Sequence, residues 1–327
     1  MMLKVCVFGG GAIGGYLAGH LARAGRCEVS VVARGATLTA IRENGIRVHT
    51  PEGTFNVRVR ASEDAREFGP QDYVFIALKA HQVDDALENI AALIGSQTVV
   101  LPPTTGLPYY FFHRAAGPFA QARLPGIDPH DNQWRALPPD QVLGCVYWIG
   151  AHSSEPGVVE QDGTMAGCPI GELDGQHSER ATVLADLLSA SGIPSKVNDD
   201  IRAAIWVKFV NSLCWNPVAV LTQATLGEMA DANGVVPLVH AMMEEADALA
   251  KRVGVNVRPE PGRRIALTLR APSHKMSMLQ DLEAGRPLEL DPLRASLRAI
   301  SELTQMSTPT LDAVLALAGL RAQRPAK

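Results

Sequence analysis

The sequence is poor in the features that mark nucleic-acid binding and membrane insertion. Charged residues make up only 20% of its 327 residues, the formal net charge is -4, and the Lys and Arg residues are scattered along the chain. Binding to phosphates needs clustered basic residues, so we expect no nucleic-acid partner. No apolar run approaches the ~20 residues that a membrane-spanning helix needs. We therefore also expect no membrane partner.

Cysteine is sparse, and its spacing suggests no pairing. The five cysteines are odd in number and far apart, with no Cys-x-x-Cys pair: Cys6, Cys27, Cys145, Cys168 and Cys214. This pattern argues against a zinc site and against a disulfide framework, and we expect no bound metal. The first predicted strand begins almost at Met1, which leaves no room for a signal peptide. A reduced, cytoplasmic protein is the expectation.

The first part of the chain alternates short apolar runs with helical periodicity. Strands are predicted at 5–8, 29–32, 73–78 and 98–101, and helical spacing occurs between them, as at 83–93. Strands that alternate with helices favour an α/β fold with a doubly wound parallel sheet of the Rossmann type. The chain is also longer than a single core usually supports, so two domains are expected.

The second part of the chain has a different pattern. A proline-rich segment, 102–139, is interpreted as an irregular excursion from the sheet, and shorter strands are expected at 143–149, 157–160 and 169–172. From about Asp199 the pattern is helical, and Asp291-Pro292 and Thr308-Pro309 each combine an N-cap residue with proline at the first helical position. We expect a dinucleotide-binding domain at 1–197 and an all-helical catalytic or substrate domain at 198–327.

A glycine-rich turn follows the first predicted strand and opens a helix. It comprises Gly9, Gly10, Gly11, Ala12, Ile13 and Gly14. In a dinucleotide site the first glycine permits the tight turn, the second lets the pyrophosphate approach the backbone, and the third allows close packing of helix on strand. The free N–H groups of the helix then face the phosphates. A glycine turn without a ligand is the alternative.

The end of the second strand bears on which dinucleotide binds. NAD sites usually place an acid there, whereas this chain has Ala33-Arg34-Gly35. A guanidinium suits a 2′-phosphate through charge-assisted hydrogen bonds. Arg34 therefore favours NADPH as the cofactor. The alternative is that Arg34 is an ordinary surface arginine with no role in binding.

Polar residues recur on one face of a predicted apolar helix. Lys208, Ser212 and Asn216 are spaced by four residues, so they share a face. Lys and Asn among Trp, Phe and Leu are costly to bury without partners, and Pro217 should kink the helix. The alternative is a lysine that extends to solvent from an amphipathic helix. Glu289 lies between apolar neighbours before a predicted helix, where a solvated loop acid is the alternative.

These residues belong to a larger set of matching segments, through which the sequence resembles the ketopantoate reductases (2-dehydropantoate 2-reductases) along nearly its whole length. The segments are Gly9–Gly14, Leu78-Lys79-Ala80-His81-Gln82, Gly106-Leu107-Pro108, Trp206-x-Lys208, Asn216-Pro217 and Ser277-Met278-Leu279-Gln280-Asp281, with Glu289 further on. The glycine motif is shared by many families, whereas the block that begins at Ser277 is more specific.

The resemblance implies a two-domain NADPH enzyme of pantothenate biosynthesis that reduces a 2-keto acid to a 2-hydroxy acid. By resemblance, Lys208 is the proton donor, and Asn216 and Ser277 bind substrate. Glu289 contacts the cofactor near its ribose, and Lys79 and Gln82 line the cofactor cleft. The chemistry agrees, because hydride transfer to a ketone leaves charge on oxygen that a positioned acid must neutralise. A homodimer through the helical domain is also expected.

Two positions depart from the family pattern. Thr105 stands before Gly106 where the family has an Asn that touches the cofactor and the reacting end of the substrate. Ser212, with Asn211 beside it, occupies the substrate-binding position four residues after Lys208, where the family also has Asn. These changes concern the identity of the substrate more than the fold, and they point to a relative that reduces a different 2-keto acid.

Two other functions compete with the reductase. One is another dehydrogenase with a Rossmann domain and a helical domain, such as a 3-hydroxyacid type, which would also use a lysine of the helical domain. The block at Ser277–Asp281 argues against it. The other is a catalytically idle NADP-binding protein, for which Thr105 and Ser212 are the only support.

Overall fold

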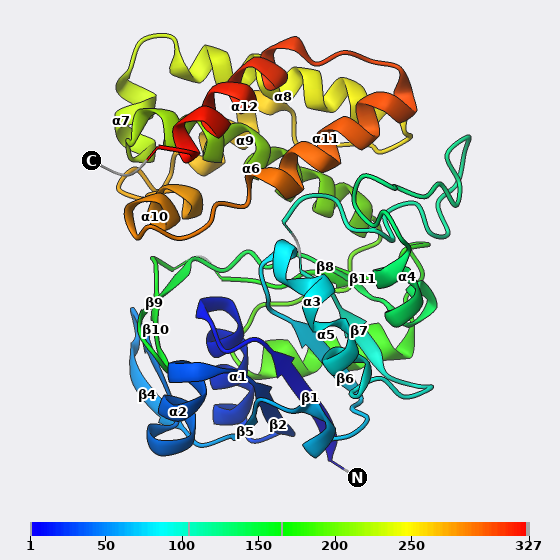
Figure 1. The fold of residues 1–327 in the computed structure, drawn as a ribbon, viewed down its shortest axis with the longest axis vertical. Coiled ribbons are helices and arrows are strands. Elements are labelled where there is room, and N and C mark those ends of the chain that lie inside the picture. Colours follow the sequence, from blue (N-terminus) through cyan, green and yellow to red (C-terminus); the bar gives the residue numbers. More distant parts are fainter. Residues whose placement is uncertain (1, 104, 165, 325–327) are drawn as a thin grey trace. The chain divides into compact units, whose positions relative to one another are not determined.

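A computed structural model describes residues 2–103, 105–164 and 166–324 (Figure 1). Contacts divide the chain into two compact units. The α/β unit comprises Met1–Thr104 and His130–Ile201, and the helical unit comprises Thr105–Pro129 and Arg202–Lys327. The expected fold class is confirmed, since a parallel sheet with helices precedes an all-helical region. The segment 105–129 packs with the helical unit, an assignment that the sequence analysis did not make.

The α/β unit is built on a five-stranded parallel sheet with the order β5-β2-β1-β6-β7. Its strands are β1 (Leu3–Phe8), β2 (Cys27–Val32), β5 (Arg60–Ser62), β6 (Tyr73–Ile76) and β7 (Val99–Leu101). Valine-rich runs buried on both faces, as in β1, are typical of parallel strands. The chain extends from β1 to one side through β2 and then to the other through β6. The strand order therefore reverses between β1 and β6, the place where such sheets bind ligands.

Helices α1 (Ala12–Ala24), α2 (Gly35–Asn44), α3 (Val83–Ala91), α4 (Asn132–Ala136) and α5 (Glu179–Ala190) complete this unit, with short 3-10 turns at Ala65–Glu67, Ala80–Gln82 and Pro139–Gln141. Helix α1 also packs on a second sheet, of order β4-β3-β10-β9. A Cβ atom at Gly19 would lie 2.6 Å from Val48 and one at Gly15 would lie 2.7 Å from Val159, so this packing requires glycine.

The second sheet contains most of the strands that the sequence analysis missed. It consists of β3 (Ile46–Thr50), β4 (Gly53–Val57), β9 (Ala151–Glu155) and β10 (Val158–Gln161). Strand β9 is polar and largely exposed, so its sequence lacks the apolar alternation that predicts a strand. The strands expected at 143–149 and 169–172 are short, reduced to β8 (Gly144–Cys145) and β11 (Ile170–Gly171).

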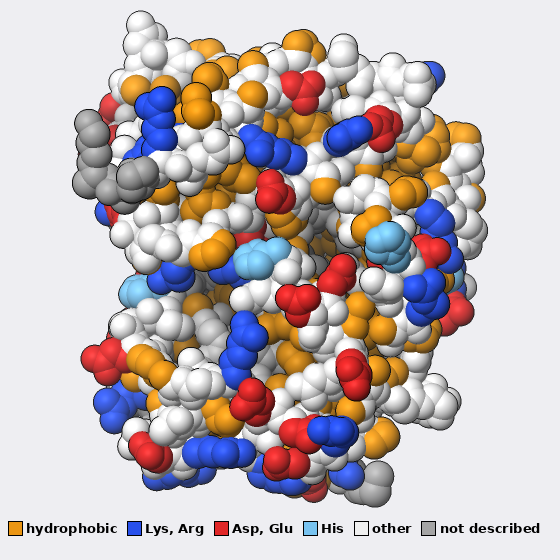
Figure 2. All heavy atoms as spheres, viewed as in Figure 1, with side chains coloured by type: hydrophobic (Ala, Val, Ile, Leu, Met, Phe, Trp, Pro, Cys, Tyr) orange, Lys and Arg blue, Asp and Glu red, His pale blue; other side chains and the backbone are white. Residues whose placement is uncertain are grey.

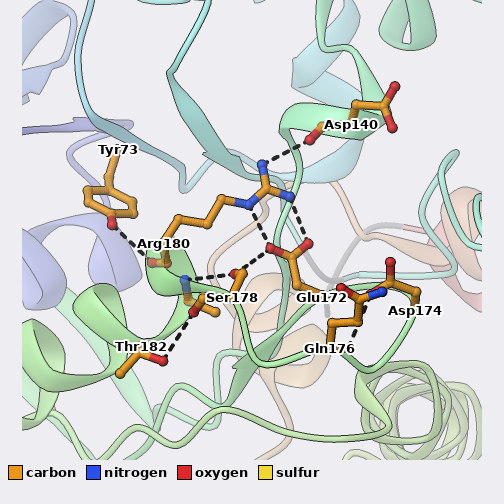
Figure 3. Close-up of polar contacts among 9 residues, drawn as sticks. Tyr73, Asp140, Glu172, Asp174, Gln176, Ser178, Arg180 and Thr182 are labelled. Atoms are coloured by element: carbon orange, nitrogen blue, oxygen red, sulfur yellow. Dashed lines mark hydrogen bonds and ion pairs between the residues drawn. The ribbon is translucent and has the colours of Figure 1, made fainter.

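A partly buried polar cluster joins α5 to the large sheet (Figure 3). The Glu172 carboxylate accepts hydrogen bonds from Ser178 Oγ and from Nε and Nη2 of Arg180. The remaining Arg180 nitrogen, Nη1, donates to the Asp140 carbonyl, and Tyr73 OH donates to the Arg180 carbonyl. Because each charged group is paired, the cluster can be buried without an isolated charge.

The helical unit contains α6 (Ile201–Thr222), α7 (Leu226–Asp231), α8 (Val235–Arg252), α9 (Pro261–Thr268), α10 (Ser277–Glu283), α11 (Leu290–Thr304) and α12 (Pro309–Ala322). Helix α6 carries the large side chains Trp206, Phe209 and Trp215, all fully buried. Aromatic packing joins it to the segment 105–129, since the rings of Phe111 and Trp206 are 5.8 Å apart.

Helix α6 is long and apolar enough to cross a membrane by length and composition, with a mean hydropathy of 1.3 over its most apolar window. The expectation that no apolar segment is long enough to span a membrane was therefore wrong by this criterion. In the structure 67% of that window is buried, as in the core helix of a globular protein. Acidic and basic side chains are interspersed over the face of the molecule drawn in Figure 2.

Two predicted helix starts have different outcomes. Helix α12 begins at Pro309 with Thr308 at its N-cap, as predicted. Helix α11 begins at Leu290 with Glu289 at the N-cap, so the start predicted at Asp291-Pro292 was wrong. Pro292 is tolerated within the first turn because the N–H groups there have no partner inside the helix. Pro217 lies inside α6, which continues to Thr222.

Candidate functional site

The glycine turn lies at the carboxyl end of β1, between the ends of its two neighbouring strands. The Gly9 N–H donates to the carbonyl of Val32, the last residue of β2, at 2.8 Å, and the Ala77 N–H donates to the Phe8 carbonyl at 2.8 Å. Gly9 has a φ of 116°, and a Cβ atom there would lie 2.9 Å from the Ala77 oxygen. Only glycine fits this position. The hydrogen bonds to both neighbouring strands place the turn at the point where the strand order reverses.

The same turn leaves open space where a pyrophosphate would bind. A Cβ atom at Gly14 would lie 1.8 Å from the Gly9 oxygen, so helix α1 packs closely on the turn. At Gly11, by contrast, a Cβ atom would meet nothing within 4 Å. Gly11 is the N-cap of α1 and provides no side-chain cap, and the first turn has no acid. The helix N–H groups therefore suit an anion, and the residues present fit a dinucleotide.

Three further candidates lie at the same edge of the large sheet. Arg34 is exposed at the N-cap of α2, directly after β2. Lys79 and Gln82 follow β6 and are partly buried, and the Lys79 N–H donates to Gln82 Oε1 at 3.2 Å. Because the strands are parallel, their carboxyl ends bring Arg34, Lys79 and Gln82 to the edge that holds the glycine turn.

Lys208 and Glu289 interact within the helical unit. Burial lowers the pKa of Lys208, and the nearby negative charge of Glu289 acts in the opposite direction. Lys208 lies on α6, whereas Glu289 is the N-cap of α11. The structure thus brings together two residues that lie far apart in the sequence. A lysine whose pKa is lowered can release its proton more readily, which suits a general acid.

Asn216 connects α6 to the start of α10 and is 3% exposed. Its Oδ1 accepts the Met278 N–H at 3.2 Å and the Ser277 hydroxyl at 3.4 Å, and its Nδ2 donates to the Ser212 carbonyl at 3.2 Å. Ser277 is itself exposed. Asn216 therefore holds Ser277 beside the helix that carries Lys208 and Ser212.

Asn211 has a different environment from Ser212. Its Oδ1 accepts a hydrogen bond from Thr268 Oγ1 of α9 at 3.0 Å. The side chain of Asn211 thus joins two helices and does not take the position that Ser212 occupies. Thr105 is partly buried and begins the segment that packs with the helical unit.

Sequence reasoning missed Ser296, which binds the backbone next to Gly106. The Leu107 N–H donates to Ser296 Oγ at 2.8 Å. A signal for Ser296 existed, because it is a polar residue among Leu293, Leu297 and Ile300 on the apolar face of this helix. The pattern of α11 could not show, however, that the partner of Ser296 is the backbone of Leu107, which is remote in the sequence.

The cysteines are free and buried. Burial raises the pKa of Cys6 and Cys145 to about 12 and that of Cys27 to about 11. Thiols with such pKa values are poor nucleophiles at neutral pH. Within residues 2–103, 105–164 and 166–324, three or more His, Cys, Asp and Glu side chains do not gather into a group that could hold a metal ion.

The parallel sheet with its glycine turn and the helical region with its partly buried Lys208 are the features of a class, the two-domain oxidoreductases. The model of the ketopantoate reductase PanE/ApbA family matches residues 5–175, and that of its C-terminal region matches residues 200–322. The chain therefore belongs to the ketopantoate reductase PanE/ApbA family, which confirms the resemblance.

Individual relatives agree with the family. The chain is 42% identical over 316 residues to a 2-dehydropantoate 2-reductase of Mesorhizobium japonicum, which covers 96% of both chains. A structure from Ralstonia solanacearum, described as a candidate ketopantoate reductase, is 37% identical with a TM-score of 0.91 and covers 99% of this chain and 98% of that one. A D-mandelate dehydrogenase solved with NADH and anilino(oxo)acetate is 20% identical, with a TM-score of 0.82 over 98% of each chain, and shares the fold.

Proposed function

We propose that this protein reduces 2-dehydropantoate or a closely related 2-keto acid to the 2-hydroxy acid, with NADPH as the hydride donor and Lys208 as the proton donor. The observation that carries the proposal is the partly buried Lys208, whose pKa is lowered by burial and raised by Glu289. The family supports the reaction class, because its members are reductases that act on a small keto acid. We assign the dinucleotide-binding domain to 1–197 and the catalytic or substrate domain to 198–327, with Glu289 of the latter also contacting the cofactor and Thr105 bordering both cofactor and substrate.

Residues of the α/β unit would hold the cofactor. The free N–H groups at the start of α1, together with the space at Gly11, would receive the pyrophosphate. We assign the 2′-phosphate to Arg34, because a guanidinium binds phosphate oxygens in pairs. Lys79 and Gln82 would border the nucleotide. When bound, NADPH supplies the hydride that reduces the keto carbon.

Residues of the helical unit would bind the acid and move the proton. The Lys208 ammonium group would donate a proton to the keto oxygen as negative charge develops there. The resulting Lys208 amine would then take up a proton from solvent. Glu289 would keep Lys208 protonated by opposing the effect of burial. Ser277 would turn its hydroxyl from Asn216 Oδ1 to the substrate carboxylate, while Asn216 would still hold the start of α10 through the Met278 N–H. Ser212 and Thr105 would border the same substrate.

An assay of NADPH oxidation with a panel of 2-keto acids tests this function. We expect turnover with 2-dehydropantoate or another branched 2-keto acid. Lys208→Ala should lose roughly 10²–10⁴ in turnover, the usual contribution of a general acid, while NADPH binding and the fold survive. Lys251→Ala, which changes an exposed lysine on α8, is the matched control and should keep full turnover. Near-normal turnover of Lys208→Ala would refute the role of Lys208.

Without turnover of any 2-keto acid by the natural protein, the reductase assignment would fail. If the same preparation still binds NADPH, the result would favour a catalytically idle NADP-binding protein. Oxidation of a 3-hydroxyacid with NADP⁺ would instead favour the other dehydrogenase type.

The double variant Thr105→Asn, Ser212→Asn tests which residues select the substrate. A site with polar contacts discriminates strongly, so the two shorter side chains should relax discrimination in the natural protein. We expect the double variant to gain in kcat/KM on 2-dehydropantoate relative to a bulkier 2-keto acid. A ratio that does not change, or that changes in the opposite direction, would show that these two positions do not select the substrate.

A further inference from the structure

Ser296 is a polar residue on the buried face of α11. It is 1% exposed, and the side chains of Leu293, Leu297 and Ile300 around it are also buried. A hydroxyl group in an apolar interface is costly unless its hydrogen bonds are made. The partners of Ser296 therefore indicate what the residue does.

The Ser296 hydroxyl bridges α11 to a segment that is distant in the sequence. It donates to the Pro292 carbonyl one turn earlier at 2.7 Å. It accepts the Leu107 N–H at 2.8 Å, across 189 positions of the chain. A buried backbone N–H needs an acceptor, and Ser296 provides it here. The hydroxyl thus donates within α11 and accepts from Leu107, and the second of these bonds holds Leu107 on α11.

The backbone of Gly106 lies directly on the first turns of α11. Gly106 has a φ of 80°, which glycine adopts without strain. A Cβ atom there would lie 2.7 Å from Ser296 Oγ and 3.0 Å from the Pro292 oxygen. These close contacts fix the position of the Gly106 backbone on α11. Thr105 is the residue immediately before it.

A few residues further along, the same segment is attached to α6. The Arg202 guanidinium, in the first turn of α6, donates to the carbonyls of Phe111 and His113. The first part of the segment is thus held both by the helix of Lys208 and by the helix whose N-cap is Glu289.

We propose that Ser296 is a positioning residue, which sets Thr105 and Gly106 at a defined place relative to Glu289. The proposal rests on the function proposed above, in which Thr105 borders the substrate. Glu289 begins α11 and the turn is bound to α11, so one rigid helix provides a common frame for both. Without the hydroxyl, the turn would lose the bond that holds it on this frame.

Steady-state kinetics of three variants test the proposal. Ser296→Ala should lower kcat by roughly 10- to 100-fold, the scale expected for misplacement of a reacting group, with a smaller change in KM. Ser296→Thr should restore most of kcat, since a threonine hydroxyl in a helix can make the same bond to the preceding turn. The control is Ser301→Ala on the same helix, because Ser301 Oγ is buried without a partner among the described residues. It should leave kcat unchanged.

Hydrogen exchange of the Leu107 amide provides a readout that needs no activity. We expect protection in the natural protein, at least tenfold faster exchange in Ser296→Ala, and no change in Ser301→Ala. Unchanged exchange or unchanged kcat in Ser296→Ala would overturn the proposal, as would an equal loss of kcat in Ser301→Ala. Failure of the natural protein to reduce any 2-keto acid would overturn the proposed function instead, while exchange would still report whether Ser296 holds the turn.

Discussion

At the scale of single residues, Lys208 is subject to two opposing influences. Burial disfavours the ammonium form and lowers its pKa, whereas the carboxylate of Glu289 favours that form. Between the lowered value and the ordinary 10.5, the unfolded chain binds more protons at this site than the folded protein does. In that window Lys208 makes the folded state more stable as pH rises. Catalysis depends on pH in the opposite sense, because the proton donor must be charged.

We expect the turnover number to fall at alkaline pH with a midpoint below 10.5, as Lys208 loses its proton. Glu289→Gln should move this midpoint to lower pH, since it removes the charge that opposes burial. The pH profiles of kcat for the two proteins measure the shift. The exchange Glu302→Gln on an exposed position of the same helix is the control and should leave the midpoint in place. A midpoint that rises in Glu289→Gln would contradict the assignment.

Arg34 should decide which nicotinamide cofactor is preferred. It is exposed at the end of β2, where an NAD site would have an acid. Arg34→Ala should weaken the binding of NADPH and leave that of NADH unchanged. Arg26→Ala, just before the opposite end of β2, is the matched control and should affect neither. Fluorescence titrations with both cofactors measure this, and equal affinities in the natural protein would show the assignment to be wrong.

At the scale of elements, α8 and α9 are joined by a buried ion pair. Arg264 Nη2 of α9 donates to Asp247 Oδ2 of α8, and the Arg264 side chain is 4% exposed. Arg264 Nε and Nη1 and Asp247 Oδ1 have no hydrogen-bond partner among the described residues. Burial raises the pKa of Asp247, with Arg264 acting against this. The pair is thus incompletely satisfied, so the gain from pairing only partly offsets the cost of burial.

Removal of one partner should therefore cost more than replacement of both. Arg264→Ala leaves a carboxylate in the interface and should lower the free energy of unfolding by roughly 3–5 kcal/mol. The double variant Arg264→Met, Asp247→Leu should lie close to the natural protein. Urea denaturation measures both, with Arg298→Ala as the control, because its ion pair with Glu302 is exposed. A double variant less stable than Arg264→Ala would refute the argument.

At the scale of the whole molecule, the segment 105–129 belongs by contacts to the helical unit although the chain passes through it between parts of the α/β unit. Tyr110, Phe111 and Phe112 of this segment are buried. Phe111 packs on Trp206, and Arg202 binds the backbone of the segment. The first 201 residues therefore carry apolar side chains whose packing partners come later in the sequence.

A fragment of residues 1–201 should consequently expose an apolar surface. We expect it to bind the dye 8-anilinonaphthalene-1-sulfonate and to associate in size-exclusion chromatography, whereas the intact chain should do neither to the same extent. Replacement of Phe111 and Phe112 by Ser in the fragment should reduce both signals. A fragment that stays monomeric and leaves the dye unbound would contradict the packing described for this segment.

The sequence alone determined the features that are encoded within a few neighbouring residues. The glycine turn could be predicted because the spacing of its glycines is set by one tight turn and the helix start that follows it. The contact between Gly14 and Gly9 involves residues only five positions apart. The strands β1, β2, β6 and β7 followed from continuous apolar runs. The start of α12 at Thr308-Pro309 followed from the local preferences of a helix N-terminus.

The family motifs singled out Lys208, Asn216, Ser277 and Glu289, but only the tertiary structure decided which of them touch. Asn216 meets Met278 because α6 packs against the start of α10, and Ser296 meets Leu107 across 189 positions. The polar strand β9 and the placement of the segment 105–129 likewise depend on which faces pack together. Such contacts join surfaces that are remote in the chain, and the periodicity of each segment reports only its own buried face.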